Sequence, residues 1–200
     1  MNQLLLIPLA YLLGSFPSAY VAGRLIAGID IKQHGSGNVG GTNTLRVLGP
    51  GPGIAVALAD VFKALLPTLW ARQLFGGNVW PTLLVALAAV LGHNFSIWLR
   101  FRGGKGIATT IGASIALFPV NIAILVAVAI LIVLVTRYVS LASLALVLLL
   151  PGLLWFRGAT SAEIWFGIIL AAMGVVRHSS NIKRLLSGTE NKIGSQKKQA

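Results

Sequence analysis

Long apolar runs with few or no charged side chains alternate with short polar segments along almost the whole chain. These runs cover residues 1–23, 54–75, 79–99, 138–156 and 160–177. Because a helix needs about 20 mostly apolar residues to cross the hydrocarbon core of a bilayer, each run predicts one transmembrane helix. The polar segments between the runs are then loops at the two membrane faces.

A sixth run, residues 106–136, is uncharged and, at 31 residues, too long for one straight span. Phe118-Pro119-Val120-Asn121 stands in its middle and favours a break or a kink. The Lys and Arg positions decide between one helix and two, because cytoplasmic loops collect cations. Two helices put 13 of the 16 cations on one side and two on the other, whereas one helix gives seven against eight.

The sequence therefore predicts seven transmembrane helices, with the N-terminus outside and the C-terminus in the cytoplasm. The fourth and fifth helices are short, and they need not both cross the whole membrane. Composition agrees, since 56% of the 200 residues are hydrophobic and 10% are charged, against about 25% charged in a soluble domain. We predict an all-α, polytopic membrane helix bundle over residues 1–187, followed by a loose, polar cytoplasmic tail over 188–200.

Charge and cysteine content narrow the chemistry. Sixteen Lys and Arg against four Asp and Glu give a net charge of +12, and the chain has no cysteine. Anionic lipids and anionic substrates explain the excess better than nucleic acid does. The four acids are scattered, which disfavours a metal site built from carboxylates. We expect a lipid bilayer as a partner, and no nucleic acid, metal or cofactor.

The first polar cluster, residues 34–49, reads HGSGNVGGTNTLRVLG and is called here the first glycine-rich segment. It combines glycines, hydroxyl and amide side chains and one arginine with no carboxylate, and these groups suit a cradle for an anion such as phosphate. A helix is predicted to begin near Thr42 or Asn43, which are good N-caps, with Arg46 about one turn in. The alternative is an ordinary glycine-rich turn between two helices.

The second glycine-rich segment, residues 101–106, reads FRGGKG and is followed by Thr109 and Thr110. It is basic and opens a helix, so its N–H groups and the positive end of the helix dipole are expected to face an anion. Its spacing is not that of a Walker A motif. The alternative is a cytoplasmic loop whose cations follow the positive-inside rule and whose glycines permit a tight turn.

The third polar cluster, residues 177–184, reads RHSSNIKR at the end of the last apolar run. His178 and Asn181 are three residues apart and share a helix face. The alternative is a group of snorkelling cations beside a solvated histidine. Ser143 is either a helix cap or a hydroxyl turned toward the site.

Two further polar groups lie inside apolar runs. Asp60 and Lys63 are three residues apart, and we expect them to pair and support packing, because unpaired charges in a membrane are costly. A direct role for this pair is the alternative. His93-Asn94, at the inner end of the run 79–99, is either an interfacial histidine or support behind the site.

Together these motifs resemble those of the acyl-phosphate:glycerol-3-phosphate acyltransferases, the PlsY family of bacterial inner-membrane enzymes. The resemblance covers nearly the whole chain in the family's order. One position departs from it, since the family more often has alanine where Gly41 stands. The matching pieces are Gly14-Ser15-Phe16-Pro17, Gly35-Ser36-Gly37-Asn38-Val39-Gly40 with Thr42, Asn43 and Arg46, Asp60-x-x-Lys63, Gly92-His93-Asn94-Phe95, Phe101-Arg102-Gly103-Gly104-Lys105-Gly106, and Arg177-His178-x-x-Asn181-Ile182 running to Gly188-x-Glu190.

The resemblance implies a reaction and a location. An acyl group would pass from acyl-phosphate to the 1-hydroxyl of glycerol 3-phosphate, giving lysophosphatidic acid and inorganic phosphate, the first step of phosphatidic acid and phospholipid synthesis. The enzyme would be a multi-pass protein of the bacterial inner membrane with its active site facing the cytoplasm. We expect it to be a monomer. The rival hypothesis is an organic-phosphate transporter, which the one-sided polar clusters and the lack of inverted repeats disfavour.

Residue roles follow from the resemblance together with the chemistry of the three clusters. The base that takes the hydroxyl proton stays open between His178 and the substrate's own phosphate. Catalytic roles are expected for Ser36, Asn38, Arg46, Lys105, His178 and Asn181. Substrate binding is expected for Gly35, Gly37, Gly40, Thr42, Asn43, Arg102, Gly103, Gly104, Gly106 and Ser143. Structural roles are expected for Asp60, Lys63 and Glu190.

Overall fold

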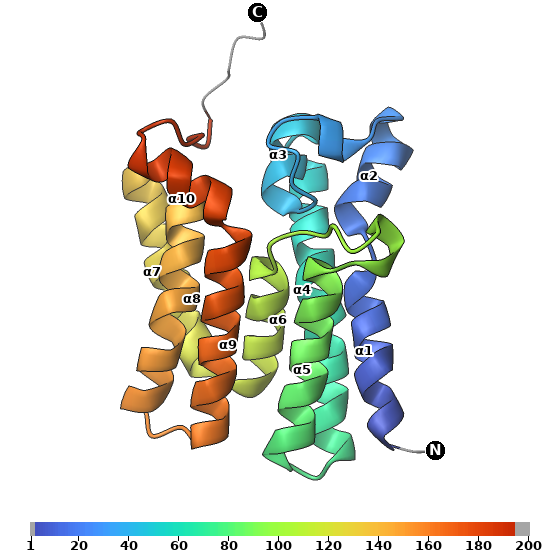
Figure 1. The fold of residues 1–200 in the computed structure, drawn as a ribbon, viewed down its shortest axis with the longest axis vertical. Helices are drawn as coiled ribbons and strands as arrows, with labels where there is room; N and C mark the ends of the chain where they lie inside the picture. The colour runs from blue at the N-terminus through green and yellow to red at the C-terminus, as the bar shows by residue number, and fades with distance from the viewer. Residues whose placement is uncertain (1–2, 195–200) are drawn as a thin grey trace, which may run out of the picture. The chain divides into compact units, whose positions relative to one another are not determined.

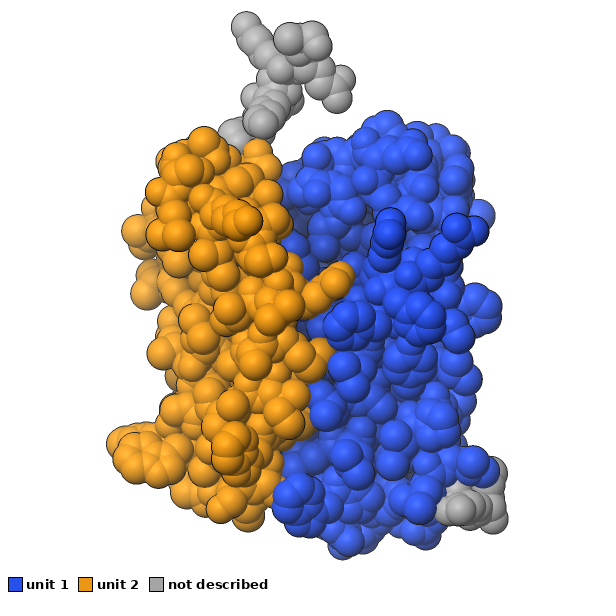
Figure 2. All heavy atoms as spheres, viewed as in Figure 1, with its two compact units in different colours: residues 1–119 blue, residues 120–200 orange. Residues whose placement is uncertain are grey.

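The computed structural model describes residues 3–194, and every regular element in that range is helical (Figure 1). The chain divides into two compact units, residues 1–119 and 120–200, which Figure 2 shows in different colours. All three polar clusters lie at ends of helices, with the two glycine-rich segments in the first unit and the third cluster in the second.

The first apolar run is broken, whereas the sequence suggested one continuous helix. A 3-10 turn, Gln3–Leu5, leads into α1 (Leu6–Ser15), and α2 (Ser18–Ala27) follows after Phe16 and Pro17. Proline has no N–H to donate into the preceding turn, so the helix stops before it. The break places the Phe16 carbonyl inside the unit, where a side chain of another helix can bind it.

The first unit is held by close helix crossings at glycine. α1 packs on α5 (Val79–Asn94) where Gly14 meets the backbone of Ala89 and Gly92 meets that of Tyr11. A Cβ on either glycine would overlap those backbone atoms. Small residues at such crossings let membrane helices approach closely.

Three further helices complete the first unit. α3 (Gly41–Leu48) packs on α4 (Pro50–Leu74) through Gly53, and α6 (Ile107–Leu117) packs on α4 through Gly112. The carbonyl of Ala116, in the last turn of α6, accepts a hydrogen bond from the Arg72 guanidinium. A carbonyl in the last turn of a helix has no hydrogen-bond partner within the helix, and Arg72 supplies that partner inside the apolar region.

The second unit contains α7 (Pro119–Thr136), α8 (Val139–Phe156), α9 (Ser161–Arg177) and α10 (Ser179–Leu186). α8 and α9 form a helical hairpin in which Gly174 packs on Val147. α9 opens with a capping box between Thr160 and Glu163. The run 106–136 breaks between α6 and α7, as the sequence predicts.

Five segments of the described chain are long and apolar enough to span a membrane: Gln3–Ala27, Pro50–Leu74, Val79–Leu99, Pro119–Thr136 and Val139–Phe156. α9 and α10 pass the same test together but are bent by 64°. α6 is apolar with 11 residues, and at 1.5 Å per residue it covers roughly half of a bilayer core. The protein is an all-helical integral membrane protein, and the count of seven spans and their orientation stay predictions.

Candidate active site

The side chain of Asn43 makes four hydrogen bonds that shape the first glycine-rich segment. It is 1% exposed. Its Oδ1 accepts hydrogen bonds from the Ser36 N–H at 2.7 Å and from the Ser36 hydroxyl at 3.1 Å. Its Nδ2 donates to the carbonyl oxygens of Ile31 and His34 at 3.3 and 3.0 Å. The amide is occupied on both sides by protein groups, so Asn43 shapes the segment from inside.

The helix within this segment, α3, begins earlier than the sequence predicts. α3 starts at Gly41, and Gly40 precedes it without a side-chain cap. Thr42 and Asn43 therefore lie in the first turn, and the prediction that one of them caps the helix is wrong. The reason is the engagement of Asn43 with the preceding loop, which removes its oxygen from the helix end.

Two glycines allow the segment to fold back over Asn43. Gly35 and Gly37 have φ values of +62° and +70°, a region that side chains disfavour. A Cβ on Gly35 would also overlap the Asn43 Oδ1. Ser36 and Arg46 remain exposed. These two side chains can reach a ligand without rearrangement of the backbone.

The second glycine-rich segment rests on the end of α5. The Gly103 N–H donates to the Asn94 carbonyl at 3.2 Å, and the Gly104 N–H donates to the His93 carbonyl at 3.0 Å. These N–H groups are used inside the protein, so the expectation that they face an anion is wrong. The backbone of α5 needs them because its last carbonyls have no partner within the helix.

Lys105 stands where the second segment passes into α6. Gly106, with φ +82°, precedes the helix, and the Thr109 hydroxyl donates to its carbonyl at 2.9 Å. Lys105 is half-buried and Arg102 is exposed. The positive end of the α6 dipole therefore lies beside one lysine. This arrangement suits a phosphate bound by charge and by the first turn of a helix.

The two glycine-rich segments touch each other. A Cβ on Gly104 would overlap the Val39 carbonyl, so the backbones of residues 39 and 104 are in close contact. Arg46 lies on α3, within the first segment, and Lys105 directly follows Gly104 in the second. The first unit thus brings together two basic, glycine-rich segments whose contacting residues, Val39 and Gly104, are 65 positions apart in sequence.

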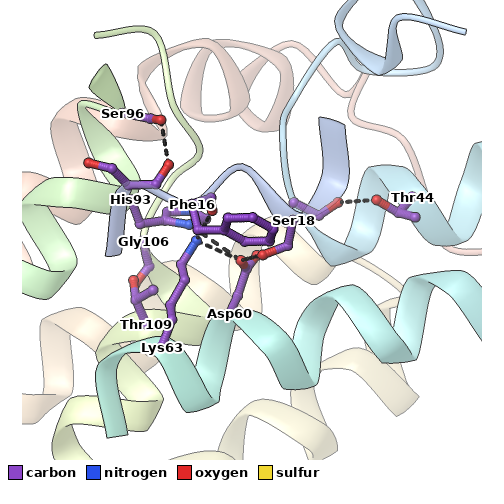
Figure 3. Close-up of polar contacts among 11 residues, drawn as sticks. Phe16, Ser18, Thr44, Asp60, Lys63, His93, Ser96, Gly106 and Thr109 are labelled. Carbon is purple, nitrogen blue, oxygen red and sulfur yellow. Dashed lines mark hydrogen bonds and ion pairs between the residues drawn. The ribbon is translucent and has the colours of Figure 1, made fainter. Parts of the chain in front are cut away.

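A buried polar cluster lies behind this contact (Figure 3). The Asp60 carboxylate accepts from the Ser18 hydroxyl at 2.9 Å and pairs with the Lys63 ammonium at 2.8 Å, as the sequence predicts. Lys63 also donates to the Phe16 carbonyl at 2.9 Å. His93 Nδ1 lies 3.7 Å from the same carboxylate oxygen. The cluster joins α4, α5 and the α1–α2 break.

The third cluster is ordered by contacts within the second unit. His178 is 2% exposed, and its Nδ1 lies 2.8 Å from the Gly174 carbonyl. A carbonyl oxygen accepts only, so Nδ1 carries the proton and a neutral ring presents Nε2 as an acceptor. Asn181 donates from Nδ2 to Glu190 at 2.8 Å, which directs its Oδ1 away from that carboxylate.

Glu190 collects donors from two helices. Its carboxylate accepts from the Ser140 hydroxyl at 3.1 Å, from Asn181 at 2.8 Å and from the Arg184 guanidinium at 2.8 Å. Burial opposes the charged form, but these hydrogen bonds and the Arg184 charge outweigh it and lower the pKa of Glu190 below its ordinary value. An ionised carboxylate therefore ties α8, α10 and the following segment together.

The segment after α10 is docked, and the expectation of a loose tail is wrong for residues 188–194. The Ile193 N–H donates a backbone hydrogen bond to the Arg137 carbonyl at 2.8 Å. The Arg137 guanidinium donates to the Ile193 carbonyl at 2.9 and 3.1 Å. Residues 195–200 lie outside the described residues.

The first unit brings the first and second segments together, and the second unit brings His178, Asn181 and Glu190 together. Ser143, also in the second unit, donates to the Val139 carbonyl at 2.8 Å within its own helix. A pocket shared by all three clusters stays a prediction. Sequence reasoning missed the four hydrogen bonds of Asn43 and gave support behind the site as only one of two roles for His93, because both depend on backbone groups that a sequence pattern does not show.

Comparison with known proteins extends the assignment from motifs to the whole chain. The family model described as glycerol-3-phosphate acyltransferase matches residues 4–188. The glycerol-3-phosphate acyltransferase of Halalkalibacterium halodurans is 46% identical over 194 residues, covering 94% of each chain. That of Synechococcus sp. strain CC9902 is 43% identical and covers 99% of this chain and 98% of its own.

Solved structures show the same similarity in three dimensions. A crystal structure of PlsY (YgiH), an integral membrane glycerol 3-phosphate acyltransferase in its glycerol 3-phosphate form, matches with a TM-score of 0.93 and 38% identity, covering 97% of this chain and 96% of that one. Its lysophosphatidic acid form matches with a TM-score of 0.90. With its helical membrane fold and its two adjoining basic segments, the chain belongs to the PlsY family of glycerol-3-phosphate acyltransferases.

Proposed function

We propose that this enzyme transfers an acyl group from acyl-phosphate to the 1-hydroxyl of glycerol 3-phosphate, forming lysophosphatidic acid and inorganic phosphate. The observation that carries the proposal is the contact between the two glycine-rich segments at Val39 and Gly104, which sets Arg46 and Lys105 in neighbouring segments of one unit. A reaction between two phosphorylated molecules needs two anion sites side by side. Membership of the family supports the acceptor.

The reaction depends more on positioning the two substrates than on strongly activating either of them. Acyl-phosphate is a mixed anhydride whose phosphate leaves readily. The 1-hydroxyl oxygen attacks the acyl carbonyl carbon, a new C–O bond forms, the bond to phosphate oxygen breaks, and the hydroxyl proton passes to a base. Holding the two reactants in line supplies much of the rate. Arg46, in the first glycine-rich segment, binds the phosphate of acyl-phosphate as a two-pronged donor, and Lys105, in the second, binds the phosphate of glycerol 3-phosphate as a point charge.

The developing negative charge on the carbonyl oxygen needs donors. Ser36 and Asn38 are the proposed donors from the first segment. The Ser36 hydroxyl donates to Asn43 in this structure, so it has to rotate toward the substrate when the acyl group binds. A hydroxyl rotor turns at little cost, and donors aimed at developing charge are worth about 3–4 kcal/mol each in acyl transfer.

The proton acceptor is proposed to be a phosphate of the substrate, with His178 orienting it. Nδ1 of His178 faces the Gly174 carbonyl, and Nε2 is proposed to be the ring atom that meets the substrate. A phosphate dianion has a second pKa near 6, so it can take a proton near neutral pH. His178 as the base itself is the alternative, and both place the ring in the same orientation.

Location and assembly follow the same proposal. The enzyme is proposed to lie in the bacterial inner membrane with its site on the cytoplasmic face, where glycerol 3-phosphate is soluble, and to act as a monomer. The acyl chain is proposed to lie between helices, open to lipid. The uneven distribution of Lys and Arg supports this orientation.

Protein purified in detergent tests the proposal. Incubation with acyl-phosphate and glycerol 3-phosphate is expected to release phosphate and form lysophosphatidic acid in equal amounts, measured by a phosphate assay and mass spectrometry. Omission of glycerol 3-phosphate should abolish the lipid product. A transporter of organic phosphates would release no phosphate, and that result would exclude the proposal.

A further inference from the structure

We propose that His93, backed by Asp60 and Lys63, is a positioning residue that holds the second glycine-rich segment and thereby sets the affinity for glycerol 3-phosphate. The inference rests on the proposed function, in which Lys105 of that segment binds a phosphate. His93 contacts the segment at Gly103 and Gly104, immediately before that lysine.

The contact between His93 and the segment uses both the backbone and the side chain of the histidine. Its carbonyl accepts the Gly104 N–H at 3.0 Å. Its imidazole lies where a Cβ on Gly104 would stand, so that any side chain at position 104 would overlap Nε2. His93 thus contacts the segment through both its carbonyl and its ring, and the ring together with the Val39 carbonyl requires glycine at position 104.

The imidazole is itself held from behind. Its Nδ1 lies 3.7 Å from the Asp60 carboxylate, a distance beyond a hydrogen bond, at which the carboxylate favours a ring that turns an N–H toward it. Asp60 is 2% exposed; its charge is balanced by Lys63, and it also accepts a hydrogen bond from Ser18. Charges inside a membrane protein are costly and persist where they do a job. The geometry assigns to Asp60 and Lys63 the role of orienting the His93 ring.

The cluster also binds the backbone at the α1–α2 break, and a further hydrogen bond joins this break to the chain after α5. Lys63 donates to the Phe16 carbonyl at the α1–α2 break, and the Ser96 hydroxyl donates to the Ser15 carbonyl. A small cavity lies between the cluster and the second segment, lined by Ser15, Lys63, His93, Ser96, Gly103 and Gly104. Because close packing is interrupted there, polar contacts decide where the segment sits.

The variants His93→Ala and His93→Gln test the role, with Thr82→Val as a matched control. Thr82 is a 2% exposed polar side chain near the start of the same helix. In His93→Ala, Asp60 keeps Lys63 and Ser18, so no charge is left unpaired. Steady-state kinetics with each substrate varied in turn separates the KM for glycerol 3-phosphate from the KM for acyl-phosphate.

We expect His93→Ala to raise the KM for glycerol 3-phosphate by about tenfold or more, because a shift of about 1 Å in a binding segment has effects of this size. The KM for acyl-phosphate should stay within about twofold. His93→Gln, whose planar amide fills part of the space of the ring, should recover most of the loss. Thr82→Val should leave both KM values unchanged.

Two outcomes would overturn the inference. A lower kcat with both KM values unchanged would indicate only a smaller folded fraction, and an equal rise in both would indicate a general distortion. If His93→Ala fails to accumulate, the double variant Asp60→Asn, Lys63→Met replaces it, because it removes the carboxylate charge beside the ring without leaving the buried Lys63 charge unpaired. The expected shift is then smaller and in the same direction, and unchanged KM values overturn the proposal.

Failure of this inference is distinguishable from failure of the proposed function. Wild-type turnover without a selective KM change in the variants overturns the inference alone. Absence of wild-type turnover with acyl-phosphate overturns the proposed function. In that case calorimetric titration of wild type and His93→Ala with glycerol 3-phosphate decides the inference, a weaker Kd in the variant supporting it and an equal Kd or no binding to either overturning it.

Discussion

The buried amide of Asn43 accepts two hydrogen bonds from Ser36, one from its N–H at 2.7 Å and one from its hydroxyl at 3.1 Å. Its other end donates to two carbonyls of the same loop. A single side chain therefore sets the shape of the segment that is proposed to stabilise the acyl carbonyl. Its contribution to activity should be large although it has no need to touch a substrate.

Asn43→Ala is expected to lower kcat/KM by about 100-fold or more and the free energy of unfolding by about 1–3 kcal/mol, because several buried partners lose their hydrogen bonds. Thr44→Val is the control, since Thr44 is equally buried and bonds only to the Gly40 carbonyl through its hydroxyl. Kinetics and thermal unfolding in detergent measure both effects. Equal losses of activity in the two variants would contradict the prediction.

Removing either proposed phosphate-binding cation should damage turnover strongly. Arg46→Ala and Lys105→Ala are each expected to lower kcat/KM by about 10- to 100-fold, the range for a charge-assisted hydrogen bond. Arg157→Ala removes an exposed cation that follows α8. That control should stay within about twofold, and a comparable loss there would mean that the effect comes from overall charge.

His178→Gln distinguishes the two proposed bases. Glutamine keeps a polar, hydrogen-bonding side chain at this buried position but cannot take up a proton. If a substrate phosphate is the base, kcat should fall by no more than about 10- to 100-fold and stay measurable. Complete loss of turnover in a variant that still binds glycerol 3-phosphate would identify histidine as the base.

The lowered pKa of Glu190 predicts how stability varies with pH. A carboxylate whose pKa is lower in the folded state stabilises the fold above its unfolded pKa, near 4.5, and this contribution is lost as pH falls through the folded value. The difference in unfolding midpoint between wild type and Glu190→Gln should therefore be constant from pH 7 to about 5 and shrink at lower pH. A difference independent of pH down to about 3 would contradict the assignment.

The close helix crossings predict opposite effects of the same substitution at two glycines. Gly14→Ala forces a Cβ into the Ala89 backbone and should lower the free energy of unfolding by at least about 1–3 kcal/mol, as overpacking does. Gly152→Ala, in α8 with open space around it, should be neutral or stabilise by up to about 1 kcal/mol. Thermal unfolding measures both, and matching shifts would contradict the packing argument.

The sequence predicted those features that depend on local spacing. The break at Pro119 and the pair of Asp60 with Lys63 both follow from rules that operate within a few residues. The first span was expected to continue through Phe16 and Pro17, but it breaks there, and the Phe16 carbonyl freed at this break is bound by Lys63, 47 residues away. Proline alone does not reveal whether a helix kinks or stops.

The parts of the site that escaped prediction depend on distant backbone groups. The family resemblance implied that Asn43 binds a substrate, yet its partners are Ser36 and two backbone carbonyls of the preceding chain. The polar composition after residue 187 predicted a loose tail, whereas Glu190 finds Ser140, 50 positions earlier. Such hydrogen-bond partners depend on the path of the folded chain, and the amino-acid types alone do not indicate them.

The docking of residues 188–194 makes this short segment, which contains no helix, important for the third cluster. A nonsense mutation directly after Leu186 would keep every helix of the described chain and still delete Glu190, which holds Asn181, and Ile193, which holds Arg137. Such a truncated product would insert and fold its spans yet lack the anchor of its third cluster. Fusion partners and affinity tags therefore belong beyond residue 194.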